Sequence, residues 1–387
     1  MFERYTAEIF PDEAIVRPND RQGRLEPDFL LPEGTTIFSA DNHIELSEDI
    51  FFERFPESMR DKAPRVWDNG GVPGIGIGGE SFLPEAYNEV LAPFAGLPGG
   101  NSSHMDQRMR DMTDEGIDKE LAFPNAILAL LGYPDYEVRE LCFRTYNQYI
   151  AEIQDRYPNR FYGVGLINWW DAKRTRETLA ELKQLGLRTF MLPINPGTFT
   201  DGEPIDYAST RMTPVWEEIE ASGLPVAHHI GETFSQPCEF NRMSISFVHS
   251  AVPFRDLFAR YIFGGILDRH PALQVGWFEA GINWVVSAIQ DAEFSHRSFW
   301  HMENLKIAHD PEYYWRNHMC ASFMVDPLGL EMIDRIGFEN VMWSCDYPHN
   351  ESSFSYSRRS VNHVARIVGP ERAPAVLAGN VMRFLKL

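Results

Sequence analysis

The feature that most constrains the fold is a regular alternation of short apolar runs with longer amphipathic segments. The apolar runs are rich in β-branched and aromatic residues, which is typical of buried strands, and the amphipathic segments mostly end at Gly or Pro, as helices do. The eight predicted strands span residues 35–40, 119–123, 161–167, 187–193, 224–230, 273–279, 319–323 and 340–345. The predicted helices span residues 105–116, 136–157, 174–185, 212–222, 254–269, 284–294, 326–336 and 370–385.

Strands that alternate with helices indicate βαβ units and a parallel sheet, and this number of units favours a closed (β/α)₈ (TIM) barrel over an open doubly wound sheet. The open sheet is further disfavoured because no Gly-x-Gly-x-x-Gly motif follows the first strand. We therefore expect an α/β protein with one barrel domain at residues 35–387. An extended arm rich in Pro, Asp, Glu and Arg precedes it at residues 1–34, and a Gly-rich insertion of loops or a small hairpin follows the first strand at residues 68–100.

The charge balance excludes several classes of partner. Lys and Arg total 35 against 56 Asp and Glu, a net charge of −21, so the basic face that nucleic acids require is missing. No run approaches the roughly 18 apolar residues of a membrane span, and the charged N-terminus is not a signal peptide. The four cysteines are far apart and form no Cys-x-x-Cys, as in a reducing compartment. We expect a soluble, cytoplasmic protein without a membrane or nucleic-acid partner.

Polar residues capable of binding a metal follow several predicted strands. In a barrel the carboxyl ends of the strands converge on one mouth, where active sites are built. The residues concerned are Asp41, His43, His229, Glu279 and Asp346. Asp41 and His43 share one side of an extended segment, so both can chelate one cation, and His229 and Asp346 would complete the ligand set. Mixed imidazole and carboxylate ligands without thiolates suit a catalytic Zn, Mn or Fe ion better than a structural zinc.

Each of these residues also has a purely structural interpretation. Asp-x-His is common, one of His228 and His229 must face the helix layer, Glu279 can be an ion-pair partner, and Asp346 can be a turn residue. Together, however, such groups at several strand ends are a much stronger signal than any one of them.

Two further residues near the last strand leave alternatives open, and one enzyme class is excluded. Cys345 is expected to be a small buried residue, although it precedes Asp346 and can lie near the site. His349 either reaches the site or shapes the loop. No Gly-x-Ser-x-Gly is present, which argues against a serine hydrolase.

The order of several motifs resembles a known family. From Ile37 onward the chain contains SADNHIE, LPVAHHIG, GGILDRHPALQVGWFEAGINWV, WSCDYPHNES and VLAGNVMRFLKL. These pieces resemble the amidohydrolase-related group (amidohydrolase family 2) that includes aminocarboxymuconate semialdehyde decarboxylase and the γ-resorcylate, 5-carboxyvanillate and isoorotate decarboxylases. The resemblance implies a barrel of the metal-dependent hydrolase type and one divalent metal ion, Zn or Mn. The implied ligands are Asp41, His43, His229 and Asp346. We also expect a small acidic substrate and a homo-oligomer, either a dimer or a tetramer.

Two positions depart from parts of that family. The first strand carries Asp-x-His, as in the aromatic-acid decarboxylases, where the muconate decarboxylase has His-x-His. Glu279 stands where several decarboxylases have a His that positions water or moves the proton, so their proton-transfer step does not carry over directly.

The resemblance implies decarboxylation of a small aromatic or unsaturated acid, with a carbon–carbon lyase reaction at the metal. We expect Asp346 to protonate the ring carbon, because the last-strand Asp is the acid–base residue throughout the superfamily, with Glu279 or His249 assisting. The alternative is hydrolysis, in which the metal lowers the pKa of a bound water and Asp346 takes its proton before attack on an amide, ester or lactone. The first-strand carboxylate favours decarboxylation. A non-catalytic binding barrel is disfavoured because every expected ligand position is filled.

Overall fold

The computed structural model describes residues 28–46, 49–69, 72–77, 80–82, 97–232 and 240–387. The chain forms two compact units. The first unit contains the described residues up to Val164 together with Met342–Val381, and the second contains Gly165–Val341 and Met382–Leu387. The predicted division into an arm and one barrel domain stays a prediction.

Parallel strands form the centre of both units. In the first unit the order is β1-β5-β6, with β1 at Phe38–Ile44, β5 at Lys119–Pro124 and β6 at Phe161–Gly163. The other sheet has the order β12-β11-β10-β9-β8-β7. Its strands are β7 (Gly165–Leu166), β8 (Phe190–Met191), β9 (Val226–His229), β10 (Val275–Phe278), β11 (Met319–Phe323) and β12 (Val341–Trp343).

The strand order is that of a (β/α)₈ barrel. A single residue, Val164, separates β6 from β7. The chain beyond β12 returns to β1 within the first unit, because the Asp346 amide donates to the Asp41 carbonyl at 2.8 Å and the His43 amide donates to the Tyr347 carbonyl at 2.7 Å. All eight predicted strands are confirmed, with 161–167 divided into β6 and β7.

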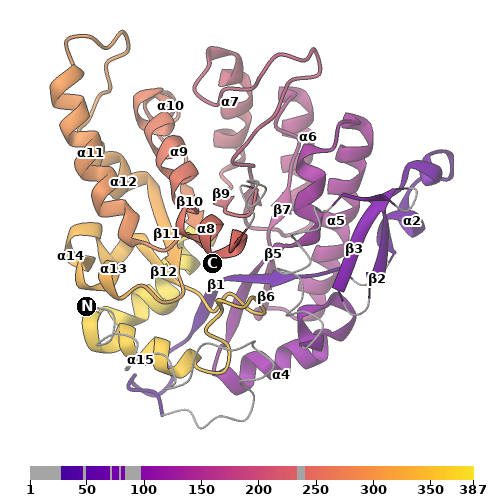
Figure 1. Ribbon diagram of the computed structural model, residues 1–387, viewed down its shortest axis with the longest axis horizontal. Coiled ribbons are helices and arrows are strands. Elements are labelled where there is room, and N and C mark those ends of the chain that lie inside the picture. Colours follow the sequence, from indigo (N-terminus) through magenta and orange to yellow (C-terminus); the bar gives the residue numbers. More distant parts are fainter. Residues whose placement is uncertain (1–27, 47–48, 70–71, 78–79, 83–96, 233–239) are drawn as a thin grey trace. The chain divides into compact units, whose positions relative to one another are not determined.

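Most predicted helices are confirmed. They are α4 (Met105–Glu115), α5 (Tyr136–Arg156), α6 (Ala172–Gln184), α7 (Thr213–Ser222) and α11 (Asn283–Phe299). Gly ends α4 and α7 because Gly116 and Gly223 have φ of 78° and 71°, the left-handed conformation that closes a helix. Within the second unit, Figure 1 shows α6 beside α7, and α9 (Val252–Phe263) beside α11.

Three predicted helices are interrupted. The helix expected at 254–269 is α9 (Val252–Phe263) followed by α10 (Ile266–Arg269), because Gly265 between them has a φ of 65°. The helix expected at 326–336 is divided into α13 (Pro327–Glu331) and α14 (Ile333–Ile336). The helix expected at 370–385 is a π-helical turn at Ala375–Gly379 that continues into α16 (Asn380–Leu385).

Several further helices, most of them short, were not predicted. They are α2 (Ile50–Arg54), α8 (Arg242–Val248), α12 (Pro311–His318) and α15 (Ser357–Val368). In α15 the spacing of the buried residues Val361, Val364 and Val368 is helical, so the sequence did contain this signal.

The Gly-rich insertion after β1 contains a small antiparallel sheet of order β2-β3-β4. Its strands are Arg65–Asn69, Val72–Ile77 and Glu80–Ser81, and Figure 1 shows β2 and β3 side by side. Gly76 is required because an added Cβ would lie 1.9 Å from the Glu80 carbonyl oxygen. The predicted hairpin is therefore present, although it begins before residue 68, and residues 83–96 lie outside the described part of the chain.

The end of the predicted N-terminal arm is anchored in the first unit. The Leu30 amide donates to Asn362 Oδ1 at 2.8 Å, and Asn362 Nδ2 donates to the Asp28 carbonyl at 2.9 Å. Residues 1–27 of the arm lie outside the described residues. Among the helices described, none combines the length and apolarity needed to cross a bilayer.

Candidate metal centre

Asp41 and His43 lie on β1 and are completely buried. Because side chains alternate along a strand, both project from the same side of β1. His43 Nε2 lies 3.8 Å from Asp41 Oδ1 and 3.3 Å from Asp346 Oδ1. The first unit therefore brings together three of the four ligands that the sequence predicts.

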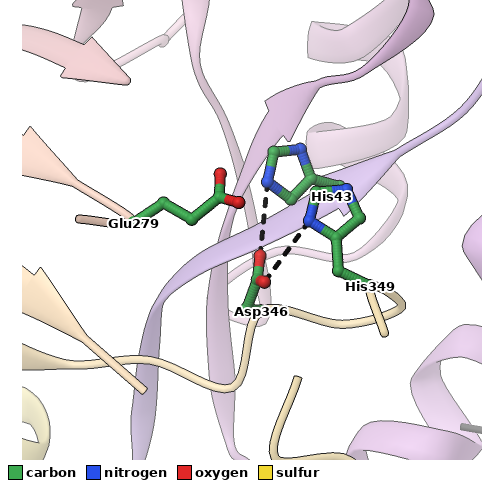
Figure 2. A group of neighbouring side chains, drawn as sticks. All are labelled: His43, Glu279, Asp346 and His349. Carbon is green, nitrogen blue, oxygen red and sulfur yellow. Dashed lines mark ion pairs between the residues drawn. The ribbon is translucent and has the colours of Figure 1, made fainter. Parts of the chain in front are cut away.

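His349 joins this group from the loop after β12. Its Nδ1 lies 3.3 Å from Asp346 Oδ2, and its ring stacks on that of His43 with centroids 4.0 Å apart. Figure 2 shows both imidazoles turned toward Asp346, with the two ion pairs drawn as dashed lines. The ligand atoms of His43, Asp346 and His349 lie within 4.8 Å of one another. Of the two interpretations left open for His349, the structure favours the one in which it reaches the site.

Asp346 is held in an unusual conformation. Its φ is 64°, in the left-handed region that non-Gly residues adopt rarely and at a cost in free energy. Neither carboxylate oxygen accepts a hydrogen bond from the described residues, and the two imidazoles are its ion-pair partners. A buried carboxylate without hydrogen-bond donors is stabilised by a bound cation. Carboxylates and imidazoles are the ligands that catalytic Zn or Mn prefers, so these residues fit a divalent metal.

The side of β1 opposite Asp41 and His43 is fixed by Asn42. Its Nδ2 donates to Glu120 Oε2 at 2.5 Å, and its Oδ1 accepts from Ser39 Oγ and from the Tyr347 amide, each at 2.9 Å. Asn42 therefore connects β1 with β5 and with the residue after Asp346. This arrangement fits the alternation of an extended segment, with Asn42 on the side of β1 away from Asp41 and His43.

A buried ion pair supports the same segment. Arg108 of α4 makes a two-pronged pair with Glu120 of β5, in which Nε and Nη2 each donate at 2.8 Å. The Arg108 Nη1 also donates to the His43 carbonyl at 2.7 Å. The backbone at His43 is thus fixed by a charged side chain.

In the second unit, His229 and Glu279 form a pair at the ends of β9 and β10. His229 Nε2 lies 3.0 Å from Glu279 Oε2, and both side chains are buried. The His229 Nδ1 lies 2.6 Å from the Ile230 carbonyl oxygen, which can only accept, so Nδ1 carries a proton. In the neutral ring this leaves Nε2 as the atom available to a metal.

His228 points to the other side of β9. Its Nδ1 lies 3.0 Å from the Leu192 carbonyl oxygen, its Nε2 lies 2.9 Å from Tyr261 Oη of α9, and its ring stacks on Trp277. Burial lowers the pKa of His228 to about 3, so the imidazole is neutral. Strand alternation predicts that one of the two adjacent histidines faces the helix layer, and His228 is that residue.

Two carboxylates near the strand ends were not selected from the sequence. Glu45 accepts hydrogen bonds from the Leu46 and Ala126 amides, and burial raises its pKa to about 7. Glu232 accepts from the Ile194 and Asn195 amides, and desolvation raises its pKa to about 7. For Glu45 a signal existed, because it continues the alternation Asp-x-His-x-Glu along β1.

The remaining candidates lie in different settings. His249, predicted as an assisting proton donor, is exposed at the end of α8. Cys345 is buried, as expected, and burial raises the pKa of its thiol to about 12. It is therefore a protonated packing residue rather than a nucleophile.

Sequence comparison identifies a family for most of the chain. A family model described as Amidohydrolase matches residues 97–387. The comparison with curated proteins gives no match.

Solved structures with a similar fold include an amidohydrolase from Mycobacterium avium subsp. paratuberculosis, with a TM-score of 0.72 and 17% identity, covering 92% of this chain and 99% of that one. For 5-carboxyvanillate decarboxylase from Sphingomonas paucimobilis the TM-score is 0.64 and the identity 19%, with 92% and 100% of the two chains covered. A dihydroxybenzoic acid decarboxylase from Polaromonas, solved with manganese and 2-nitroresorcinol, has a TM-score of 0.65 and 16% identity, with 91% and 97% covered. These likenesses establish the (β/α)₈ barrel fold.

The opposite orientations of His228 and His229 predict different consequences of mutation. His228→Gln removes a ring that stacks on Trp277 and bonds Tyr261, so we expect a lower melting temperature, with metal content and turnover per folded molecule near wild type. Thermal unfolding, metal analysis and kinetics on the same preparation check this. Complete loss of activity in a folded, metal-loaded His228→Gln protein would contradict the assigned register.

Proposed function

Because the chain belongs to the amidohydrolase family and is therefore an enzyme, we propose that it is a metal-dependent decarboxylase of a small aromatic or unsaturated carboxylic acid. The observation that carries the proposal is the buried group on and beside β1, where Asp41, His43 and Asp346 bring two carboxylates to one imidazole. A carboxylate as the first ligand of that strand is the pattern of the aromatic-acid decarboxylases. The similar folds of the carboxyvanillate and dihydroxybenzoate decarboxylases support the same choice.

We propose that Asp41, His43, His229 and Asp346 hold one divalent ion. Asp41 would supply a carboxylate oxygen, and each of the two histidines would supply its Nε2 atom. A carboxylate oxygen of Asp346 would be the fourth ligand atom. The support is the barrel itself, because the carboxyl ends of all its strands face one mouth. Zn and Mn both suit these ligands, and the manganese in the Polaromonas enzyme supports Mn.

When bound, the metal would act as a Lewis acid toward the substrate's carboxylate and its neighbouring oxygen. The protein's own residues would then carry out the proton transfer. Asp346 in its acid form delivers a proton to the carbon that carries the carboxylate, a C–H bond forms, and the C–C bond breaks with release of carbon dioxide. Asp346 recovers its proton from water. Glu279 lies 3.0 Å from His229 Nε2 and orients the reacting oxygen atoms, and His249 would assist from the exposed end of α8.

One observation favours hydrolysis as a second candidate function. Glu279 places a carboxylate, rather than an imidazole, beside His229. A carboxylate accepts hydrogen bonds and so can orient an attacking water, whose proton Asp346 would take. The substrate would then be an amide, ester or lactone.

The remaining parts of the proposal rest on the sequence. We propose a cytoplasmic homo-oligomer, a dimer or a tetramer, that acts on a small acidic substrate. The negative net charge of −21 requires a locally positive site for such a substrate, and a divalent ion would provide it.

Product analysis separates the two candidate functions. Purified protein loaded with Mn or Zn is incubated with a panel of hydroxybenzoic acids, unsaturated acids, amides, esters and lactones. We expect carbon dioxide release from one or more of the acids and no amine or alcohol from the others. Hydrolysis of the amides, esters or lactones without carbon dioxide release would refute the decarboxylase and support the second candidate.

Metal analysis tests the proposed ligands. Protein purified without chelator should contain about one Zn or Mn per chain, and Asp41→Ala or His229→Ala should lose it, because each removes a donor from a four-ligand set. His228→Gln is the matched control, since it alters the neighbouring imidazole on the outward side of β9 and should keep its metal. Stoichiometric metal in both Ala variants would rule out the assignment.

The role of Glu279 is tested by an isosteric change. Glu279→Gln keeps the shape but removes the charge, so kcat should fall by ~10²–10⁴-fold while metal content stays near wild type. Glu232→Gln is a control at another strand-end carboxylate, which accepts two backbone amides, and should mainly lower the melting temperature. Near-wild-type turnover of Glu279→Gln would show that this carboxylate is only structural. His249→Gln, assayed in parallel, should lower kcat if His249 assists.

A further inference from the structure

Glu279 is held in a backbone conformation that its residue type does not favour. Its φ is 72°, in the left-handed region, where a residue with a Cβ is strained. From this conformation its side chain reaches His229 Nε2 at 3.0 Å. A strained residue at a functional position keeps its conformation only when surrounding groups fix it.

One fixing group is the hydroxyl of Ser322. The Glu279 amide donates a hydrogen bond to Ser322 Oγ at 3.0 Å, and Ser322 is fully buried. Ser322 lies on β11, which pairs in parallel with β10 up to Trp277 and Ala321. Ser322 Oγ therefore accepts a hydrogen bond from the Glu279 amide at the point where β10 ends and the backbone adopts the left-handed conformation.

The second fixing group is the carboxylate of Asp326, which lies in the loop after β11. Its Oδ2 accepts from the Ile282 amide at 2.7 Å, from the Asn283 amide at 2.8 Å and from Asn283 Nδ2 at 3.0 Å. Its Oδ1 accepts from the Gly329 amide at 2.8 Å. This one buried carboxylate thus fixes the turn that follows Glu279.

Gly281 shows how closely the turn and the carboxylate approach. Its φ is 71°, and a Cβ there would lie 2.9 Å from Asp326 Oδ2. The Ala-Gly after Glu279 therefore allows the backbone amides to reach Asp326.

We infer that Ser322 and Asp326 are positioning residues for Glu279, which hold its backbone so that the carboxylate stays beside His229. The inference rests on the role proposed for Glu279. All of these residues belong to the second unit, and the hydrogen bonds join the segment after β10 to β11 and its following loop. Loss of either residue lets the backbone at 279 relax and moves the carboxylate away from the reacting atoms. The expected consequence is a change in kcat rather than in KM, because binding groups elsewhere are untouched.

Ser322→Ala is the direct test, and Cys320→Ala is its matched control. Cys320 lies two residues earlier on β11, on the same side, and its Sγ lies 3.8 Å from the Val275 carbonyl oxygen at the opposite end of β10. We expect Ser322→Ala to lower kcat by ~10–100-fold with KM within about two-fold of wild type, and Ser322→Thr, which keeps the hydroxyl, to recover most of the loss. Cys320→Ala should retain wild-type kcat.

A double variant that combines Ser322→Ala with Glu279→Gln shows whether the loss of kcat in Ser322→Ala depends on the Glu279 carboxylate. If Ser322 acts by positioning that carboxylate, Ser322→Ala should have little further effect on kcat in the Glu279→Gln background. An equal factor in both backgrounds, or a kcat for Ser322→Ala within about two-fold of Cys320→Ala, would overturn the inference. If Ser322→Ala does not fold, Asp326→Asn takes its place in the same cycle.

Amide hydrogen exchange tests the positioning role of Ser322 without any knowledge of the reaction. In Ser322→Ala, but not in Cys320→Ala, the amide of Glu279 and its neighbours at 280–283 should exchange faster than in wild type. Unchanged exchange would overturn the positioning role whatever the enzyme catalyses. The kinetic comparison measures formation of whichever product the substrate panel identifies. If the enzyme is a hydrolase instead of a decarboxylase, the proposed function is refuted but the test of Ser322 remains valid.

Discussion

The buried ion pair between Arg108 and Glu120 is the interaction on which the first unit's site depends. The exposed fractions of the two side chains are 0% and 1%, so neither charge is solvated by water. Arg108 also donates to the His43 carbonyl, and Asn42 donates to Glu120, so the pair fixes the backbone between Asp41 and His43. Removing one partner of such a pair leaves an uncompensated buried charge at a cost of about 3–5 kcal/mol, and here it would also free the part of β1 that carries Asp41 and His43.

The carboxylates at the strand ends fall into two groups according to their hydrogen bonds. Asp326 and Glu232 accept backbone amides and thereby fix turns after the strands of the second unit. Asp346 accepts no hydrogen bond from the described residues and faces two imidazoles. Backbone amides occupy the oxygen lone pairs of Asp326 and Glu232, whereas a buried carboxylate without donors keeps its lone pairs for a cation. The hydrogen bonds therefore distinguish the carboxylates that fix turns from the carboxylate that is open to a ligand, where the sequence shows only Asp and Glu.

The sequence predicts the strands well because buried parallel strands are short apolar runs, and it predicts the opposite directions of His228 and His229 because side chains alternate. It does not predict the left-handed φ of Asp346 and Glu279, since Asp and Glu carry no propensity that requires it. The sequence also does not predict the hydrogen bonds that join Arg108, Glu120 and Asn42, because these depend on which helix packs against which strand. The pair Gly264-Gly265 indicates a break in the helix at 254–269, but the position of the break follows only from the left-handed φ of Gly265.

We propose that a single divalent ion is bound by side chains from the ends of several strands. Anomalous X-ray scattering from crystals grown with Mn²⁺ tests it most directly, because it locates the ion without any assumption about the reaction. We expect one peak per chain within about 2.0–2.4 Å of oxygen or nitrogen atoms of Asp41, His43, His229 and Asp346. A peak that lacks both Asp41 and His229 as ligands, or no ordered ion near His43 and Asp346, would contradict it.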